Sequence, residues 1–237
     1  MKMAEENSMR IEIALNNVLK HEGGYQNNKN DAANKNSEGQ WVGTNYGITP
    51  EAYEEYFEKV PSQQDMMQMT TQQARDIYQK NYIRPIVDNL GVEPSSPIFN
   101  QVVDIAVNHG YKGAVVLVQR AAGTKVDGKA GPATKKAIQE APPRELNNAL
   151  VDARQEEYKR INKSNPDTAT FSNGWQARAE SFRDAMEEPD GRSQPIAPPM
   201  AGEGAQQPGP VQGNSGGTPM WEDPLRGGYP HPSSLRR

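Results

Sequence analysis

The sequence contains no cysteine and only three histidines among its 237 residues. The missing cysteine excludes disulfide scaffolds, thiol nucleophiles and cysteine-ligated zinc. No apolar run approaches the roughly 18–20 residues that a membrane-spanning helix needs, so we expect no membrane insertion. The formal net charge of −4 lacks the basic excess typical of nucleic-acid-binding proteins, so we do not expect nucleic acid as a partner.

The C-terminal fifth of the chain has few apolar side chains and many residues that break regular structure. Residues 188–237 hold 10 of the 19 prolines and 9 of the 21 glycines. Such a segment cannot bury enough apolar surface to offset the entropy lost on ordering. We predict a disordered tail over residues 188–237.

Helical periodicity and capping signals dominate residues 8–187. Thr49-Pro50 is typical of a helix start, and Thr70-Thr71-Gln72-Gln73 is typical of a capping box. No segment alternates apolar and polar residues over the length of a strand, so the predicted fold class is mainly α. The polar, Asn-rich residues 25–49 fit a loop or short irregular hairpins. The predicted helices cover residues 8–21, 50–59, 71–82, 97–110, 114–122 and 143–162, with two more starting at Pro132 and Ser172.

Glu22 stands at an unusual place for a carboxylate. Ile11, Leu15, Val18 and Glu22 are spaced as one stripe of a helix that the pair Gly23-Gly24 then ends. An acid in the last turn faces the negative end of the helix dipole, and apolar neighbours disfavour its charged form. Both effects predict a raised pKa, which suits a general acid.

Other common catalytic chemistries find no support in the sequence. His21-Glu22 starts like the HExxH motif of zinc proteases, but Tyr25 occupies the position of the second histidine. The sequence has no Walker-type phosphate loop and no GxSxG motif. Acid–base chemistry by carboxylates remains, and it implies no metal and no cofactor.

Two motifs in the first half carry a family resemblance. His21-Glu22-Gly23-Gly24-Tyr25, then Asp31, then Gly43-Thr44-Asn45-Tyr46-Gly47-Ile48-Thr49 resemble the EGGY-type muramidases of glycoside hydrolase family 108. These lysozyme-like enzymes are common in phage lysis cassettes. The sequence departs from the family after Asp31, where Ala32-Ala33 replace the usual Pro-Gly and an insertion precedes Gly43.

The second half resembles the peptidoglycan-binding part that follows the catalytic part in this family. The similar segments are Ala106–Gly110, Val118–Ala121, Val126–Thr134 and Gly174–Arg178. The resemblance implies a lysozyme-like catalytic domain over residues 8–94, with a small irregular loop and β region. It also implies an α-helical peptidoglycan-binding domain over residues 95–187.

The resemblance assigns roles to individual residues. It makes Glu22 the general acid. It implies that Asp31 stabilises the oxocarbenium-like transition state or activates water, and that Thr44 assists the attack of that water. Glu38, in the insertion, is a competing second carboxylate. Tyr25 and Tyr46 are candidate stacking platforms for sugar rings, and ordinary packing is the alternative for both. Asp127 and Gly128 are candidate substrate contacts, and the alternative for them is a purely structural turn.

The implied activity is that of an N-acetylmuramidase, which cleaves the β-1,4 bond between N-acetylmuramic acid and N-acetylglucosamine in bacterial peptidoglycan. An inverting reaction predicts a gap of about 6.5–9.5 Å between the Glu22 and Asp31 carboxyls, and a retaining one predicts about 5 Å. A lytic transglycosylase that uses Glu22 alone, and a non-catalytic wall-binding or virion protein, are the alternatives.

The resemblance also implies a setting for the enzyme. We expect a monomer that acts in bacterial lysis, as a phage endolysin or from the virion. The N-terminus MKMAEENSMR has no apolar segment after its first lysine, which predicts no secretory signal. We therefore expect synthesis in the host cytoplasm and action on the cell wall after holin-type release, or delivery by the virion.

Overall fold

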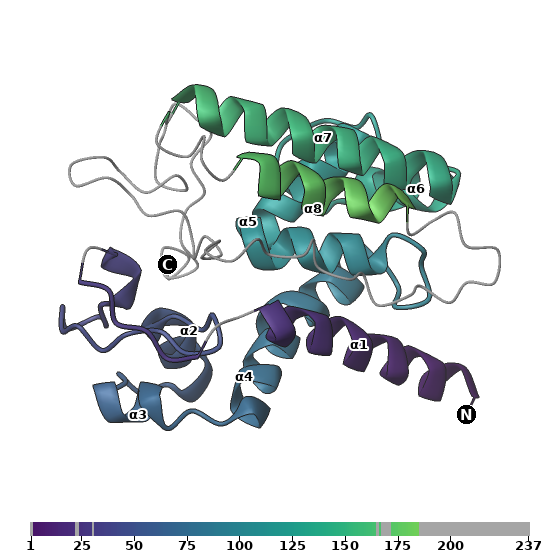
Figure 1. Cartoon of the computed structure of the whole chain (residues 1–237). Coiled ribbons are helices and arrows are strands. Elements are labelled where there is room, and N and C mark those ends of the chain that lie inside the picture. Colours follow the sequence, from purple (N-terminus) through teal and green to yellow (C-terminus); the bar gives the residue numbers. More distant parts are fainter. Residues whose placement is uncertain (1, 22–23, 30, 165, 167–171, 185–237) are drawn as a thin grey trace. The chain divides into compact units, whose positions relative to one another are not determined.

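The computed structural model describes residues 2–21, 24–29, 31–164, 166 and 172–184 (Figure 1). Glu22 and the predicted tail over residues 188–237 lie outside the described residues. The fold is mainly helical, as the sequence predicts. The described residues divide into two compact units, one within residues 2–20 and 78–184 and the other within residues 21–77.

The unit that contains residues 24–77 combines an irregular loop with short helices. The loop carries the 3-10 helix η1 (Ala32–Asn34) and three isolated antiparallel bridges, and no longer ladder occurs among the described residues. The bridges pair Gln26 with Thr44, Lys35 with Trp41 and Asn45 with Ile48. The prediction of a small irregular loop and β region is therefore confirmed.

Side-chain caps start the helices of this unit. The Thr49 hydroxyl accepts a hydrogen bond from the Ala52 amide at 3.3 Å and begins α2 (Pro50–Phe57). Thr70 and Gln73 form a reciprocal capping box at the start of α4 (Thr71–Tyr78). Both starts agree with the sequence prediction. The sequence analysis missed α3 (Gln63–Met67), which a second capping box begins.

The N-terminal helix α1 (Lys2–His21) ends where the sequence predicts and starts six residues earlier than expected. Residues 2–7 are mostly Lys, Met, Ala and Glu, which favour helix, and Glu5 in the first turn suits the positive end of the helix dipole. Leu15 and Val18 of the predicted apolar stripe are buried, and Ile11 is half-buried.

The unit that contains residues 78–184 is built around α5 (Phe99–Ala121). The π-helical segments η2 (Gln79–Ile83) and η3 (Pro85–Leu90) and the helix α7 (Pro143–Ser164) all contact α5. The helix α8 (Ser172–Asp184) lies beside α7, as Figure 1 shows. The shorter helix α6 (Pro132–Glu140) precedes α7.

The core of this unit is mainly apolar and includes a fully buried arginine. Its fully buried large side chains include Phe99, Ile83, Ile86, Leu90, Ile98, Ile105, Leu150 and Arg154. At Gly110, α5 leaves helical geometry with φ 73° and ψ 160°, a backbone conformation that glycine adopts at little cost. The sequence predicts a helix that stops at Gly110 and another over residues 114–122, and the break in helical geometry at Gly110 agrees with this prediction. Within the described residues, no helix is long and apolar enough to cross a membrane.

Candidate functional site

The loop between α1 and α2 is held together by a bridge between Gln26 and Thr44. The backbone N–H of Gln26 donates to the backbone carbonyl of Thr44 at 2.9 Å, and the backbone N–H of Thr44 donates to the backbone carbonyl of Gln26 at 2.8 Å. This pair of hydrogen bonds brings the two ends of the loop together. Asp31 and the insertion lie on the chain between them.

Asp31 lies at the start of η1. Its Oδ1 accepts a hydrogen bond from the Ala33 amide at 3.1 Å, so the carboxylate caps the helix. The Asp31 residue is only 7% exposed. Burial raises the pKa of the Asp31 carboxyl above its ordinary value, and the hydrogen bond from Ala33 opposes part of that rise.

Asn34 joins Asp31 to the segment that carries Thr44. The Asn34 amide donates to the Asp31 carbonyl at 3.0 Å. The Asn34 carbonyl in turn accepts hydrogen bonds from the Val42 and Gly43 amides at 2.9 and 3.0 Å. A short chain of backbone hydrogen bonds therefore holds the Asp31 and Thr44 regions in one framework.

Thr44 presents its hydroxyl to a side chain from the opposite side of the bridge. Thr44 is 5% exposed, and its Oγ1 accepts a hydrogen bond from Nε2 of Gln26 at 2.7 Å. The hydroxyl therefore has a defined direction on one side. The sequence analysis did not single out Gln26, because a polar residue in an Asn-rich loop carries no local signal of such a contact.

The insertion folds as a hairpin whose turn Asn36 organises. Oδ1 of Asn36 accepts hydrogen bonds from the Glu38 and Gln40 amides at 3.2 and 2.9 Å, and its Nδ2 donates to the Pro61 carbonyl at 3.0 Å. Glu38 is exposed in this turn. The competing carboxylate therefore lies in an environment unlike that of the buried Asp31.

Tyr25 and Tyr46 are both half-buried and serve the loop structurally. The Tyr25 hydroxyl donates to the Val42 carbonyl at 3.2 Å. Tyr46 has a φ of 50° and Gly47 a φ of 70°, and positive φ at both central residues is typical of a type I′ hairpin turn. Asn45 anchors this turn, because its Nδ2 donates to the Met66 carbonyl at 2.8 Å. Sugar stacking by either tyrosine stays a prediction.

The general acid expected from the sequence, Glu22, lies outside the described residues. The gap between the Glu22 and Asp31 carboxyls, which separates inverting from retaining reactions, therefore stays a prediction. Among the described residues, no group of three His, Cys, Asp or Glu side chains is arranged to hold a metal ion.

A second loop, over residues 122–131 between α5 and α6, is organised by the buried Gln119 of α5. Nε2 of Gln119 donates to Oδ1 of Asp127, the Lys129 carbonyl and Oγ1 of Thr134 at 3.0, 3.0 and 3.2 Å. Its Oε1 accepts hydrogen bonds from the Asp127 and Gly128 amides at 3.1 and 2.9 Å. The Asp127-Gly128 turn is therefore part of a structural network, and its contact with substrate stays a prediction.

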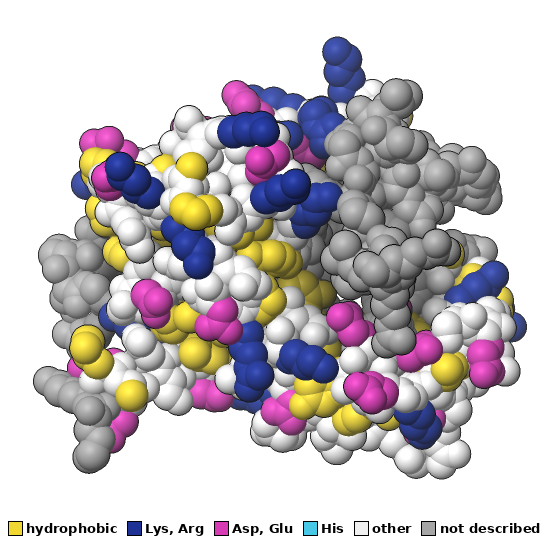
Figure 2. Space-filling model, turned by 180° about the vertical axis from the view of Figure 1, so that it is seen from behind, with side chains coloured by type: hydrophobic (Ala, Val, Ile, Leu, Met, Phe, Trp, Pro, Cys, Tyr) yellow, Lys and Arg dark blue, Asp and Glu magenta, His cyan; other side chains and the backbone are white. Residues whose placement is uncertain are grey.

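The charges on the surface are mixed. On the face drawn in Figure 2, Lys and Arg side chains of the described residues alternate with Asp and Glu side chains and with hydrophobic ones. No continuous field of one charge covers the described part of that face.

Comparison with known families assigns both halves of the chain. Residues 15–110 match the family Glycosyl hydrolase 108, and residues 113–180 match a predicted peptidoglycan domain. Residues 15–110 therefore form a glycosyl hydrolase 108 domain. The first match contains Glu22, Asp31 and Thr44, and the second contains Asp127 and Gly128. With these two domains the protein is a glycoside hydrolase that acts on peptidoglycan, as the sequence predicts.

The chain is also similar to a solved structure. The structure of SagA from Brucella abortus matches with a TM-score of 0.58 and 26% sequence identity, over 73% of this chain and 91% of that chain. No curated protein sequence gives a match.

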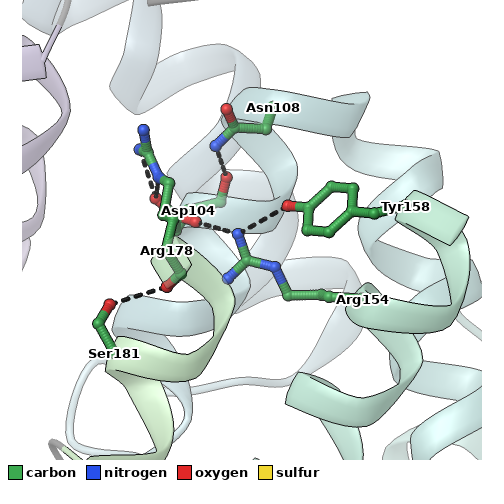
Figure 3. A network of polar contacts seen from close by, with 6 residues as sticks. All are labelled: Asp104, Asn108, Arg154, Tyr158, Arg178 and Ser181. Atoms are coloured by element: carbon green, nitrogen blue, oxygen red, sulfur yellow. Dashed lines mark hydrogen bonds and ion pairs between the residues drawn. The ribbon is translucent and has the colours of Figure 1, made fainter. Parts of the chain in front are cut away.

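A buried ion cluster connects the glycosyl hydrolase 108 match with the peptidoglycan-domain match (Figure 3). Asp104 of α5 accepts hydrogen bonds from Arg154 of α7 at 2.5 Å and from Nε and Nη2 of Arg178 of α8 at 2.9 and 2.6 Å. Burial alone raises the pKa of the Asp104 carboxyl, but the two guanidinium groups outweigh burial and hold the pKa below its ordinary value. Nη2 of Arg154 also donates to the Tyr158 hydroxyl at 3.2 Å.

His109 lies next to this cluster and is neutral near pH 7. Its ring packs against Tyr158 with 5.5 Å between centroids. Burial lowers the pKa of His109 to about 4, and the positive charge of Arg154 acts in the same direction. The cluster was not predicted, because buried and solvated charges look alike in the helical pattern of the sequence.

Proposed function

We propose that this peptidoglycan hydrolase is an N-acetylmuramidase that cleaves the β-1,4 bond between N-acetylmuramic acid and N-acetylglucosamine. Glu22 acts as the general acid, and Asp31 and Thr44 assist the attack of water. The observation that carries the proposal is the buried pair of Asp31 and Thr44, held in one hydrogen-bonded loop within the glycosyl hydrolase 108 match. The wider role in this proposal is bacterial lysis.

The proposed reaction moves two protons. Glu22 gives its proton to the bridging oxygen as the bond from that oxygen to C1 of N-acetylmuramic acid breaks. The oxygen of a water molecule forms the new bond to C1 on the opposite face, and Asp31 takes a proton from that water. This arrangement inverts the configuration at C1.

The environment of Asp31 supports its part in this reaction. A general base works best when its pKa approaches the working pH. Burial moves the pKa of Asp31 in that direction. The backbone N–H of Ala33 donates to Oδ1 of Asp31 at 3.1 Å, and this hydrogen bond restricts the rotation of the carboxylate.

The decisive experiment compares three carboxylate variants on purified sacculi. We expect Glu22→Gln and Asp31→Asn each to lower the rate of reducing-end release by about 10²- to 10⁴-fold, the usual contribution of a positioned acid or base. Glu38→Gln is the matched control, because Glu38 is an exposed carboxylate of the same loop, and we expect it to retain wild-type activity. A large loss in Glu38→Gln with full activity in Asp31→Asn would exchange the roles of the two carboxylates.

The products separate hydrolysis from its nearest rival. Mass spectrometry of the digest should show reducing N-acetylmuramic acid ends, and NMR of fresh product should show the inverted anomer. Anhydro-muropeptides as primary products would identify a lytic transglycosylase instead. Wall binding without bond cleavage by the wild type would favour a non-catalytic protein.

A further inference from the structure

The side chain of Gln26 contacts the hydroxyl of Thr44. Its Nε2 lies 2.7 Å from Oγ1 of Thr44. Gln26 is exposed and Thr44 is buried. Among the described residues, no second side chain forms a hydrogen bond with that hydroxyl.

The direction of this hydrogen bond is fixed by a second contact. The backbone N–H of Asn28 donates to Oε1 of Gln26 at 3.3 Å. The oxygen of the Gln26 side chain therefore faces Asn28, and its nitrogen faces Thr44. The backbone bridge between Gln26 and Thr44 keeps both side chains at the same place along the loop. Oγ1 of Thr44 therefore accepts the hydrogen bond from Gln26, and the hydroxyl proton of Thr44 takes no part in this contact.

The Thr44 hydroxyl can accept a second hydrogen bond, and an attacking water can donate one. A threonine hydroxyl has one donor and two acceptor positions, and Gln26 fills one acceptor position. The second acceptor position stays available for a proton of the water. If the other proton of that water goes to Asp31, the lone pairs of the water oxygen point away from both residues and toward the sugar.

We propose that Gln26 is a positioning residue for hydrolysis, which orients the Thr44 hydroxyl so that it accepts a hydrogen bond from the attacking water. The inference rests on the proposed role of Thr44. Gln26 acts through Thr44 and not through the substrate. Its loss therefore lowers kcat, while KM for the glycan strand stays the same.

The test uses the full chain and soluble, uncrosslinked glycan strands as substrate. Gln26→Met removes the hydrogen bond and keeps the length of the side chain. Gln26→Glu keeps the acceptor for the Asn28 amide but reverses the contact with Thr44, because a carboxylate accepts the Thr44 proton. We expect each variant to lower kcat about tenfold, the effect of one lost hydrogen bond, with KM within twofold of wild type.

Gln40→Glu controls for the added charge. Gln40 is an exposed amide in the same loop, and its Oε1 accepts a hydrogen bond from Nδ2 of Asn36 at 3.3 Å, which a glutamate preserves. We expect wild-type kcat for Gln40→Glu. A loss in Gln40→Glu equal to that in Gln26→Glu would show a general charge effect and overturn the inference.

A double-mutant cycle with Thr44→Val tests whether Gln26 acts through Thr44. We expect Gln26→Met to change kcat no further once the hydroxyl is absent. An equal loss in both backgrounds, or a rise in KM alone, would overturn the inference. A wild-type kcat for Gln26→Met together with a lowered kcat for Thr44→Val would also overturn the inference. That result would leave the proposed function intact. Wild-type kcat in Thr44→Val would instead overturn the proposed role of Thr44, and the inference with it.

Discussion

The ring of Tyr25 lies so close to the α-carbon of Gly43 that a Cβ there would stand 2.7 Å from Cε2 of the ring. The same Cβ would stand 2.6 Å from the Gln26 carbonyl oxygen, which takes part in the bridge to Thr44. The φ of Gly43 is 81°. Backbone conformation and close contact therefore both require glycine next to Thr44.

Gly43→Ala should displace Tyr25 or the bridge and thereby lower activity. We expect a loss of kcat together with a lower melting temperature. Gly39→Ala is the matched control, because Gly39 has a similar φ of 79° but no atom within 4 Å of its would-be Cβ. That control should cost only the strain of positive φ, about 1–2 kcal/mol of the free energy of unfolding. Equal losses in the two variants would show that contact with Tyr25 plays no part.

Asp104→Ala should destabilise the unit that contains residues 78–184 strongly. The substitution leaves the buried Arg154 without its carboxylate, and breaking a buried pair from one side costs about 3–5 kcal/mol of the free energy of unfolding. Asp152→Ala removes an ion pair whose carboxylate side chain is 64% exposed, and should cost less than about 1 kcal/mol. Urea unfolding of both variants measures the difference, and similar midpoints would contradict the prediction.

His109 should make the protein less stable in mild acid. Its pKa is lowered to about 4 in the folded state, whereas an unfolded histidine titrates near 6.5. Between these values the unfolded state binds the extra proton, so stability falls as the pH decreases through this range. From pH 7 to pH 5 the contribution of His109 should fall by about 2 kcal/mol. His109→Phe removes the titration, so its free energy of unfolding should change less than that of wild type between these two pH values.

The two roles considered for Asp127 can be separated by a pair of variants. Asp127→Asn retains an oxygen that accepts from the Lys129 amide and from Gln119, so its melting temperature should stay close to wild type. Asp127→Ala removes both contacts and should lower the melting temperature. Sedimentation with purified cell walls measures binding. Weaker wall binding by Asp127→Asn at an unchanged melting temperature would support direct contact with peptidoglycan.

Local signals predicted most of the helical framework. Thr49-Pro50 and Thr70–Gln73 start helices for reasons contained within four residues, and the structure confirms both. The five-residue helix α3 was missed, since a helix this short has too little periodicity to be recognised.

The candidate site could not be predicted from local sequence signals in the same way. Asp31 and Thr44 were singled out through a family resemblance, because nothing in their immediate neighbours marks them. The loop that holds them depends on contacts between distant residues. Asn45 binds a carbonyl 21 residues away, and Asn36 binds one 25 residues away. Buried amides of this kind look like ordinary loop residues in the sequence.

The salt bridges of Asp104 determine where this enzyme can be divided into fragments or joined to other domains. Asp104 belongs to the glycosyl hydrolase 108 match, and both of its arginine partners belong to the peptidoglycan-domain match. A fragment that starts at residue 113 would carry Arg154 and Arg178 without their shared carboxylate. Chimeras that graft this wall-binding part onto another enzyme should therefore be joined before Phe99, so that the whole of α5 travels with α7 and α8.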